Sequence, residues 1–183
     1  MNIKAIRKNA QITLSDHRWT SVATYTIFSS ILTISKIIPF GSLILKGVLN
    51  HGLKEFFLTK TNNIKIIFKG FKDFLKTTLT GIILAVYKFL WSLLFIIPGI
   101  IKRYSYALTY YILNENPELA VCEAIEISEK IMKGHKWELF VLDLTFLGWD
   151  ILNILTLGIL NILYIKPYKN YAYIEFYNTL KNK

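Results

Sequence analysis

Residues 79–101 read LTGIILAVYKFLWSLLFIIPGII, and Lys88 is the single charged side chain in this apolar run. About 20 consecutive apolar residues suffice for a helix to cross a bilayer, so the run predicts a transmembrane helix. Proline lacks a backbone donor and glycine accepts a positive φ, so Pro98-Gly99 predicts a sharp turn. We therefore expect residues 100–113 to return as the second arm of a helical hairpin.

The same order of features occurs three times: a basic and aromatic step, an apolar run, a small turn residue and a second apolar run. The first copy begins at DHRW (16–19) and the third at KGHKW (133–137). An internal repeat identifies the unit that was duplicated, which here is a hydrophobic hairpin with a charged base. The expected turn residues are Pro39, Gly41, Pro98, Gly99 and Gly158. The predicted hairpins cover residues 19–58, 79–114 and 137–177, and the predicted cytosolic segments cover 1–18, 59–78, 115–136 and 178–183.

This pattern predicts an all-α integral membrane protein with about six short transmembrane helices, plus interfacial or cytosolic amphipathic helices. Arms of roughly 17 residues rise about 26 Å at 1.5 Å per residue, short but tolerable for a bilayer. Lys166, Pro167 and Lys169 interrupt the last arm, so the alternative is a single span over residues 139–165. That alternative would place the C-terminal lysines outside the cell. The excess of basic residues on cytoplasmic segments therefore favours six arms.

Composition agrees with a membrane protein, since the 183 residues are 53% hydrophobic and 19% charged, and soluble domains are about 25% charged. The net charge is +10, and the basic residues gather at the ends of apolar runs instead of forming a nucleic-acid stripe. This distribution predicts a bacterial cytoplasmic membrane protein whose termini both face the cytoplasm and whose partner is a bilayer with anionic headgroups. The single cysteine, Cys122, excludes an internal disulfide and a multi-cysteine metal site. No cofactor and no nucleic-acid partner are expected.

Basic and aromatic side chains at the bases of the hairpins are expected to anchor them at the membrane interface. His17 and His135 occupy equivalent positions in the repeat. A metal or proton role is the alternative for them, but neither has the partner spacing of a zinc site, so headgroup contact is favoured. The predicted anchors are His17, Arg18, Trp19, Lys69, Lys72, Lys133, His135, Lys136 and Trp137.

Charged side chains on the apolar arms are costly at membrane depth, so each is a functional candidate. They are Lys88, Lys102, Arg103, Asp143 and Asp150, and the two aspartates, seven residues apart, share one helix face. We expect an aspartate to pair with one of the three cations and lock the hairpins together, with Lys88 otherwise extending to an interface. The alternative is a polar path or a ligand site.

Residues 118–133 predict an amphipathic helix outside the bilayer, which begins after Asn116-Pro117 and ends at Gly134. Its apolar face could dock a partner protein. The tyrosines between Tyr104 and Tyr111 are expected to pack helices together, with a binding cleft as the alternative.

The segments IIPGIIKRYSYALTYYILNENPELAVCEAIEISEKIMKGHKWELF (96–140) and LGWDILNILTLGI (147–159) carry a family resemblance. They resemble an uncharacterised family of bacterial multi-pass membrane proteins, domain-of-unknown-function family 975. The resemblance is most specific over residues 90–168. It implies an integral membrane protein and brings no established activity or catalytic residues.

The sequence contains no H-E-x-x-H, G-x-S-x-G or phosphate-cradling glycine loop, so we expect a protein that is not an enzyme. The expected function is a protective or modulatory role in the bacterial envelope, such as immunity to a membrane-active peptide. One alternative is a membrane component of a transport or export system, which would need a homo-oligomer or a membrane-protein partner. The other is a membrane assembly or chaperone factor that docks through residues 118–133.

Overall fold

The computed structural model describes residues 2–37, 41–94, 96–156 and 158–181, and the regular structure within these ranges is helical throughout, with no strand. The all-α prediction is therefore confirmed. Most elements are α-helices, η1 is a 3₁₀ helix and η2 is a π-helical turn. In chain order the elements are α1 (Ile3–Asp16), α2 (Arg18–Ser35), α3 (Gly41–Thr59), η1 (Ile64–Phe71), α4 (Phe74–Leu94), α5 (Ile96–Ser105), α6 (Thr109–Glu115), α7 (Val121–Ile131), α8 (Lys136–Leu144), α9 (Leu147–Leu155), η2 (Asn161–Ile165) and α10 (Lys166–Lys181).

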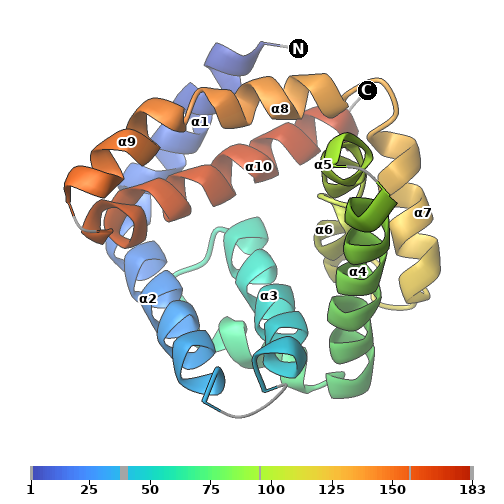
Figure 1. Cartoon of the computed structure of the whole chain (residues 1–183). Helices are drawn as coiled ribbons and strands as arrows, with labels where there is room; N and C mark the ends of the chain where they lie inside the picture. Colours follow the sequence, from blue (N-terminus) through green and yellow to red (C-terminus); the bar gives the residue numbers. More distant parts are fainter. Residues whose placement is uncertain (1, 38–40, 95, 157, 182–183) are drawn as a thin grey trace.

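The C-terminal helix α10 lies in the middle of the hydrophobic core and packs along α1 (Figure 1). Helix α1 contributes a buried stripe of Ile6, Ala10 and Leu14, four residues apart, which is the spacing of one helix face. Helix α10 buries the aromatic side chains of Tyr171 and Phe176 among others. The sequence treats residues 1–18 as a segment separate from the last arm, whereas the structure joins the two through this stripe.

Helices α2 and α3 occupy the residues predicted for the first hairpin and pack against each other. Pro39, one of the predicted turn residues, lies outside the described residues, and Gly41 begins α3. Helix α3 also meets α4 at Gly47 and Gly81, where a Cβ built on Gly81 would lie 2.6 Å from the Gly47 Cα. Real Cβ atoms do not approach backbone so closely, so only glycine permits this crossing.

The second hairpin differs from its prediction in where the helices begin and end. Helix α4 is described to Leu94 and α5 from Ile96, and residue 95 between them lies outside the described residues. Pro98 and Gly99, the predicted turn residues, are both helical and lie within α5, so the turn expected at these two residues is wrong. The predicted returning arm is divided between α5 and α6.

The third hairpin is also divided, since α8 ends at Leu144 and α9 begins at Leu147. The Thr145 hydroxyl donates to the Leu142 carbonyl at 2.6 Å, a local bond that competes with helix continuation. Gly158 has φ +86°, the left-handed conformation that its prediction as a turn residue requires. Lys166 and Lys169, expected to interrupt an arm, lie instead within the continuous helix α10.

Among the described residues one helix, α4, is long and apolar enough to cross a membrane, judged by length and composition. Its most apolar window, Phe74–Trp91, has a mean hydropathy of 1.3 and is 22% buried. The arrangement of about six spans and three hairpins in a bilayer stays a prediction.

Candidate functional site

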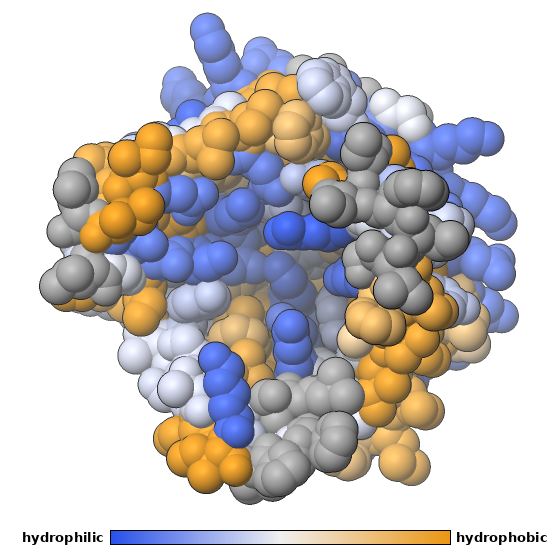
Figure 2. Space-filling model, viewed as in Figure 1, coloured by the Kyte–Doolittle hydropathy of each residue, from blue (hydrophilic) through white to orange (hydrophobic). Residues whose placement is uncertain are grey.

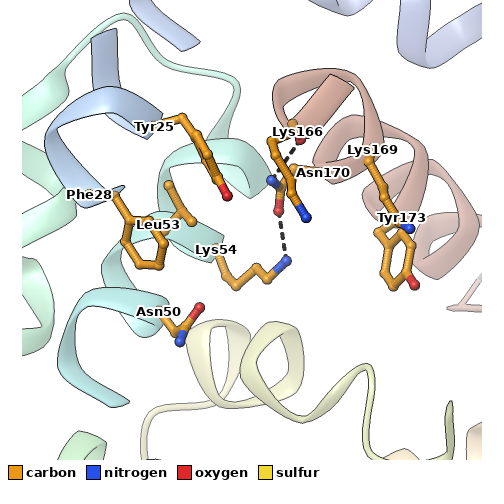
Figure 3. Close-up of a pocket in the computed structure, with 9 residues that line it drawn as sticks. All are labelled: Tyr25, Phe28, Asn50, Leu53, Lys54, Lys166, Lys169, Asn170 and Tyr173. Atoms are coloured by element: carbon orange, nitrogen blue, oxygen red, sulfur yellow. Dashed lines mark hydrogen bonds between the residues drawn. The ribbon is translucent and has the colours of Figure 1, made fainter. Parts of the chain in front are cut away.

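A cavity of about 240 Å³ lies where α2, α3 and α10 meet (Figure 3). The predicted hairpins that are furthest apart in the sequence supply its walls, since α2 and α3 belong to the first and α10 to the last. The lining contains three ammonium groups and no carboxylate. The lining residues are Tyr25, Phe28, Asn50, Leu53, Lys54, Lys166, Lys169, Asn170 and Tyr173.

Lys54 lies at the centre of this cavity without a carboxylate partner among the described residues. Its ammonium group donates to the Asn170 Oδ1 at 2.7 Å, the dashed contact between α3 and α10 in Figure 3. It also lies 5.1 Å from the ring centroid of Tyr111 and 5.9 Å from that of Tyr173. The charges that reach Lys54 are cations, those of Lys166, Lys88 and Lys169. The Asn170 amide and the two tyrosine rings are neutral, so they offset only part of the repulsion between the Lys54 ammonium group and these cations.

Lys169, by contrast, has an acidic partner. Its ammonium group lies 2.9 Å from the Asp143 Oδ1, and the Asp143 side chain is 12% exposed. The same carboxylate accepts hydrogen bonds from the hydroxyls of Tyr173, at 2.9 Å, and Tyr104, at 3.0 Å. The expected pairing of an aspartate with Lys88, Lys102 or Arg103 is wrong for Asp143. Its cation comes from α10 instead, because α8 lies beside that helix (Figure 1).

A second hollow, of about 410 Å³, shares Tyr25 and Phe28 with the cavity and extends it along α2. Leu32 gives it an apolar wall, and Lys36 and Lys46 add two further cations. Figure 2 shows the hydrophilic residues of this face gathered in a central hollow, with apolar groups of α9 and α4 around it. The two hollows together form a cationic recess with an apolar side.

The other predicted charged candidates are dispersed. Lys102 pairs with Glu129 on α7, and its ammonium group lies 4.7 Å from the Trp91 ring centroid. Arg103 and Asp150 are exposed. Lys88 is partly buried on α4 and lies among like charges, those of Lys46 and Arg103. Lys88 therefore lies among cations and does not form the expected pair with an aspartate among the described residues.

The predicted anchors divide into exposed and bonded side chains. Trp19 is 78% exposed and Trp137 is 69% exposed, as interfacial aromatics would be. The His17 ring contacts the Asn62 Oδ1 at 2.8 Å, and the His135 ring contacts a Glu138 oxygen at 2.6 Å. Arg18 lies over the neighbouring Trp19 ring, Lys69 pairs with Glu55, Lys136 is partly buried, and Lys72 and Lys133 are exposed.

Two further sequence candidates have structural roles. Ala124 and Ile125 of α7 are buried and its other apolar residues are half-buried, except for Cys122, which is exposed. Tyr111 is fully buried and stacks on Tyr177 with ring centroids 5.7 Å apart, which is helix packing. Within the described residues no group of three or more His, Cys, Asp or Glu side chains is placed to hold a metal ion.

Sequence reasoning did not single out the residues that line the cavity. Lys166 and Lys169 were noted only as residues that interrupt the last predicted arm, and Lys54, Asn170 and Tyr25 were not singled out.

The comparisons with known proteins bear on the C-terminal half of the chain. A family model described as "Protein of unknown function (DUF975)" matches residues 93–183, which include α10 and its lysines. No curated protein and no solved structure matches the chain. The family match confirms the resemblance carried by residues 96–140 and 147–159, and residues 93–183 of the chain therefore belong to the DUF975 family.

Proposed function

We propose that this chain is a non-enzymatic integral protein of the bacterial cytoplasmic membrane that protects or modulates the envelope. The observation that carries the proposal is the amount of large apolar surface left exposed. On α4, Leu75 is 76% exposed and Leu79 is 51% exposed, and on α9, Ile154 is 75% exposed. Soluble monomers rarely expose apolar patches larger than a few hundred Å², whereas a bilayer covers such surface favourably.

The polar residues support the same arrangement. The charged lining of the recess faces inward between α2, α3 and α10, and the apolar side chains of α4 and α9 face outward (Figure 2). A protein with charged residues in its interior and apolar residues on its surface is suited to the hydrocarbon core of a bilayer. The exposed Trp19 and Trp137 suit the boundary between headgroups and hydrocarbon.

The test of membrane insertion is extraction of bacterial membranes with alkaline carbonate. The wild-type chain should stay in the membrane pellet. A Leu79→Glu and Val86→Glu double variant places two carboxylates on the exposed face of α4 and should lose membrane retention or yield. The matched control, Ala5→Glu with Gln11→Glu, adds the same charge to exposed positions of α1 and should behave as the wild type. Release of the wild-type chain by carbonate would contradict the proposal.

The protective role has its own test. Bacteria that lack the gene should be killed at lower concentrations of a cationic membrane-active peptide, and expression of the chain should restore resistance. Equal killing curves with and without the gene would refute protection and leave membrane insertion standing.

A second candidate function, a membrane component of a transport or export system, is favoured by the recess itself. A cationic cavity between hairpins is the kind of site at which transporters hold an anionic substrate. Co-purification with a second membrane protein or with an ATPase would support this candidate, and a chain that purifies alone would oppose it.

A further inference from the structure

The recess has a charge imbalance that its protein neighbours do not correct. Lys54, Lys166 and Lys169 line one cavity, and Lys88 lies close enough for its charge to reach Lys54. Asp143 is the acid that pairs with one of these lysines, Lys169, and its carboxylate also accepts hydrogen bonds from two tyrosine hydroxyls. The charges of Asp143 and Asp150 also reach Lys166, and the cation of Lys169 acts on it more strongly than either of them. A mobile anion is the species that would relieve this repulsion.

The donors that remain free define the anion. Lys54 donates one N–H to Asn170 and keeps at least one more, and Lys169 donates one to Asp143 and keeps two. Lys166 and the Tyr25 hydroxyl make no side-chain hydrogen bond among the described residues and line the same cavity. The Asn170 NH₂ group is not counted among these donors, because it already donates to the Lys166 backbone carbonyl. Several N–H and O–H donors that converge from α2, α3 and α10 suit a tetrahedral oxyanion with oxygens in several directions.

The second hollow, of about 410 Å³, indicates what chemical group is attached to the anion. It opens from the shared wall of Tyr25 and Phe28 and continues past Leu32, so an apolar chain could follow it from the cavity. Its volume, about 410 Å³ against about 240 Å³ for the cavity, exceeds what a free inorganic anion needs. We propose that the recess binds a phosphate ester with an apolar tail, its phosphoryl group between Lys54 and Lys166 and its tail beside Phe28 and Leu32. A lipid headgroup and a soluble phosphate ester both carry a phosphoryl group, and only the lipid has an apolar tail.

The test uses water-soluble probes, so it does not depend on membrane insertion. Purified protein in a neutral detergent is titrated with dihexanoyl phosphatidic acid, which has both parts. The partial probes are glycerol 3-phosphate, which lacks the tail, and dihexanoylglycerol, which lacks the phosphate. Binding is measured by isothermal titration calorimetry and by native mass spectrometry. The complete probe should bind at least tenfold more tightly than either partial probe.

The variants locate the site. Lys54→Met and Lys166→Gln should each weaken the complete probe by roughly 10- to 150-fold, the range for a hydrogen bond to a charged group. Lys8→Met removes an equal charge from an exposed position of α1 and should leave binding unchanged. Thermal unfolding shows whether each variant is folded, and Lys166→Gln keeps the test decisive if Lys54→Met does not fold.

Three results would overturn the proposal. Equal affinity for glycerol 3-phosphate and the complete probe would make the recess a site for free phosphate esters. Equal affinity for dihexanoylglycerol would make it an apolar groove only. Unchanged binding in both lysine variants would place the ligand elsewhere on the molecule.

Discussion

Replacing Asp143 tests the ion pair of the recess in which a lysine has an acidic partner within the protein. Its carboxylate, 12% exposed, pairs with Lys169 and accepts hydrogen bonds from Tyr173 and Tyr104. Asp143→Ala leaves a cation and two hydroxyls without their acceptor. Breaking a buried pair by removing one partner costs about 3–5 kcal/mol. At roughly 2–4 °C per kcal/mol for a chain of this length, the midpoint of thermal unfolding should fall by about 6–20 °C.

The assay is thermal unfolding of the purified chain in detergent, followed by tryptophan fluorescence. Asp150→Ala is the matched control, because this aspartate lies on the neighbouring helix and is exposed. It should change the midpoint by less than about 2 °C, since exposed substitutions usually change stability by at most about 0.5 kcal/mol. A second change, Lys169→Met, should recover part of the loss in Asp143→Ala, which a double-mutant cycle measures. A midpoint for Asp143→Ala within 2 °C of the wild type would refute the reasoning.

Three other predictions concern packing and topology. Gly81→Ala pushes a Cβ against the Gly47 backbone and should destabilise the chain by about 1–3 kcal/mol, whereas Gly148→Ala, which meets nothing within 4 Å, should be neutral or slightly stabilising in the same unfolding assay. Cys122, exposed on α7, should resist a membrane-impermeant maleimide in intact cells and react after permeabilisation, and labelling from outside would overturn the predicted topology. Changing Lys133 and Lys136 to glutamate should lower membrane yield, at about 1 kcal/mol for each basic group near anionic lipid, and an unchanged yield would refute their role as anchors.

Much of the helical architecture could be predicted because apolar periodicity and turn residues are local signals. The first hairpin gives α2 and α3, and Gly158 has the positive φ that its place in the repeat indicates. The positions at which the predicted arms break into shorter helices could not be predicted in the same way. The break between α8 and α9 falls at Thr145 and Phe146, where no proline or glycine signals it, whereas Pro98, which does signal a break, lies within α5.

The partners of the charged residues were harder to predict for a different reason. Helical spacing reports which face of a helix is apolar and says nothing of which helix that face will meet. Asp143 or Asp150 was expected to pair with Lys88, Lys102 or Arg103 because all of them lie on apolar arms. Helix α10, beside α8, supplies Lys169 to Asp143, and α7, beside α5, supplies Glu129 to Lys102. Both partners lie on segments whose own patterns gave no sign of these contacts.

The charges on the apolar arms then separate into two kinds, which the sequence alone left as alternatives. Asp143 and Lys169 compensate each other, so removing either should lower the stability of the chain whether or not a ligand is present. Lys54 faces like charges and has no acidic partner among the described residues, so Lys54→Met removes a repulsion together with one hydrogen bond to Asn170 and should lower stability less than Asp143→Ala. A ligand that binds only the folded protein would stabilise the wild type more than the Lys54→Met variant at high concentration. The smaller loss expected for Lys54→Met without ligand, and its growth when ligand is added, therefore distinguish the cation that binds the anion from the ion pair that holds the fold together.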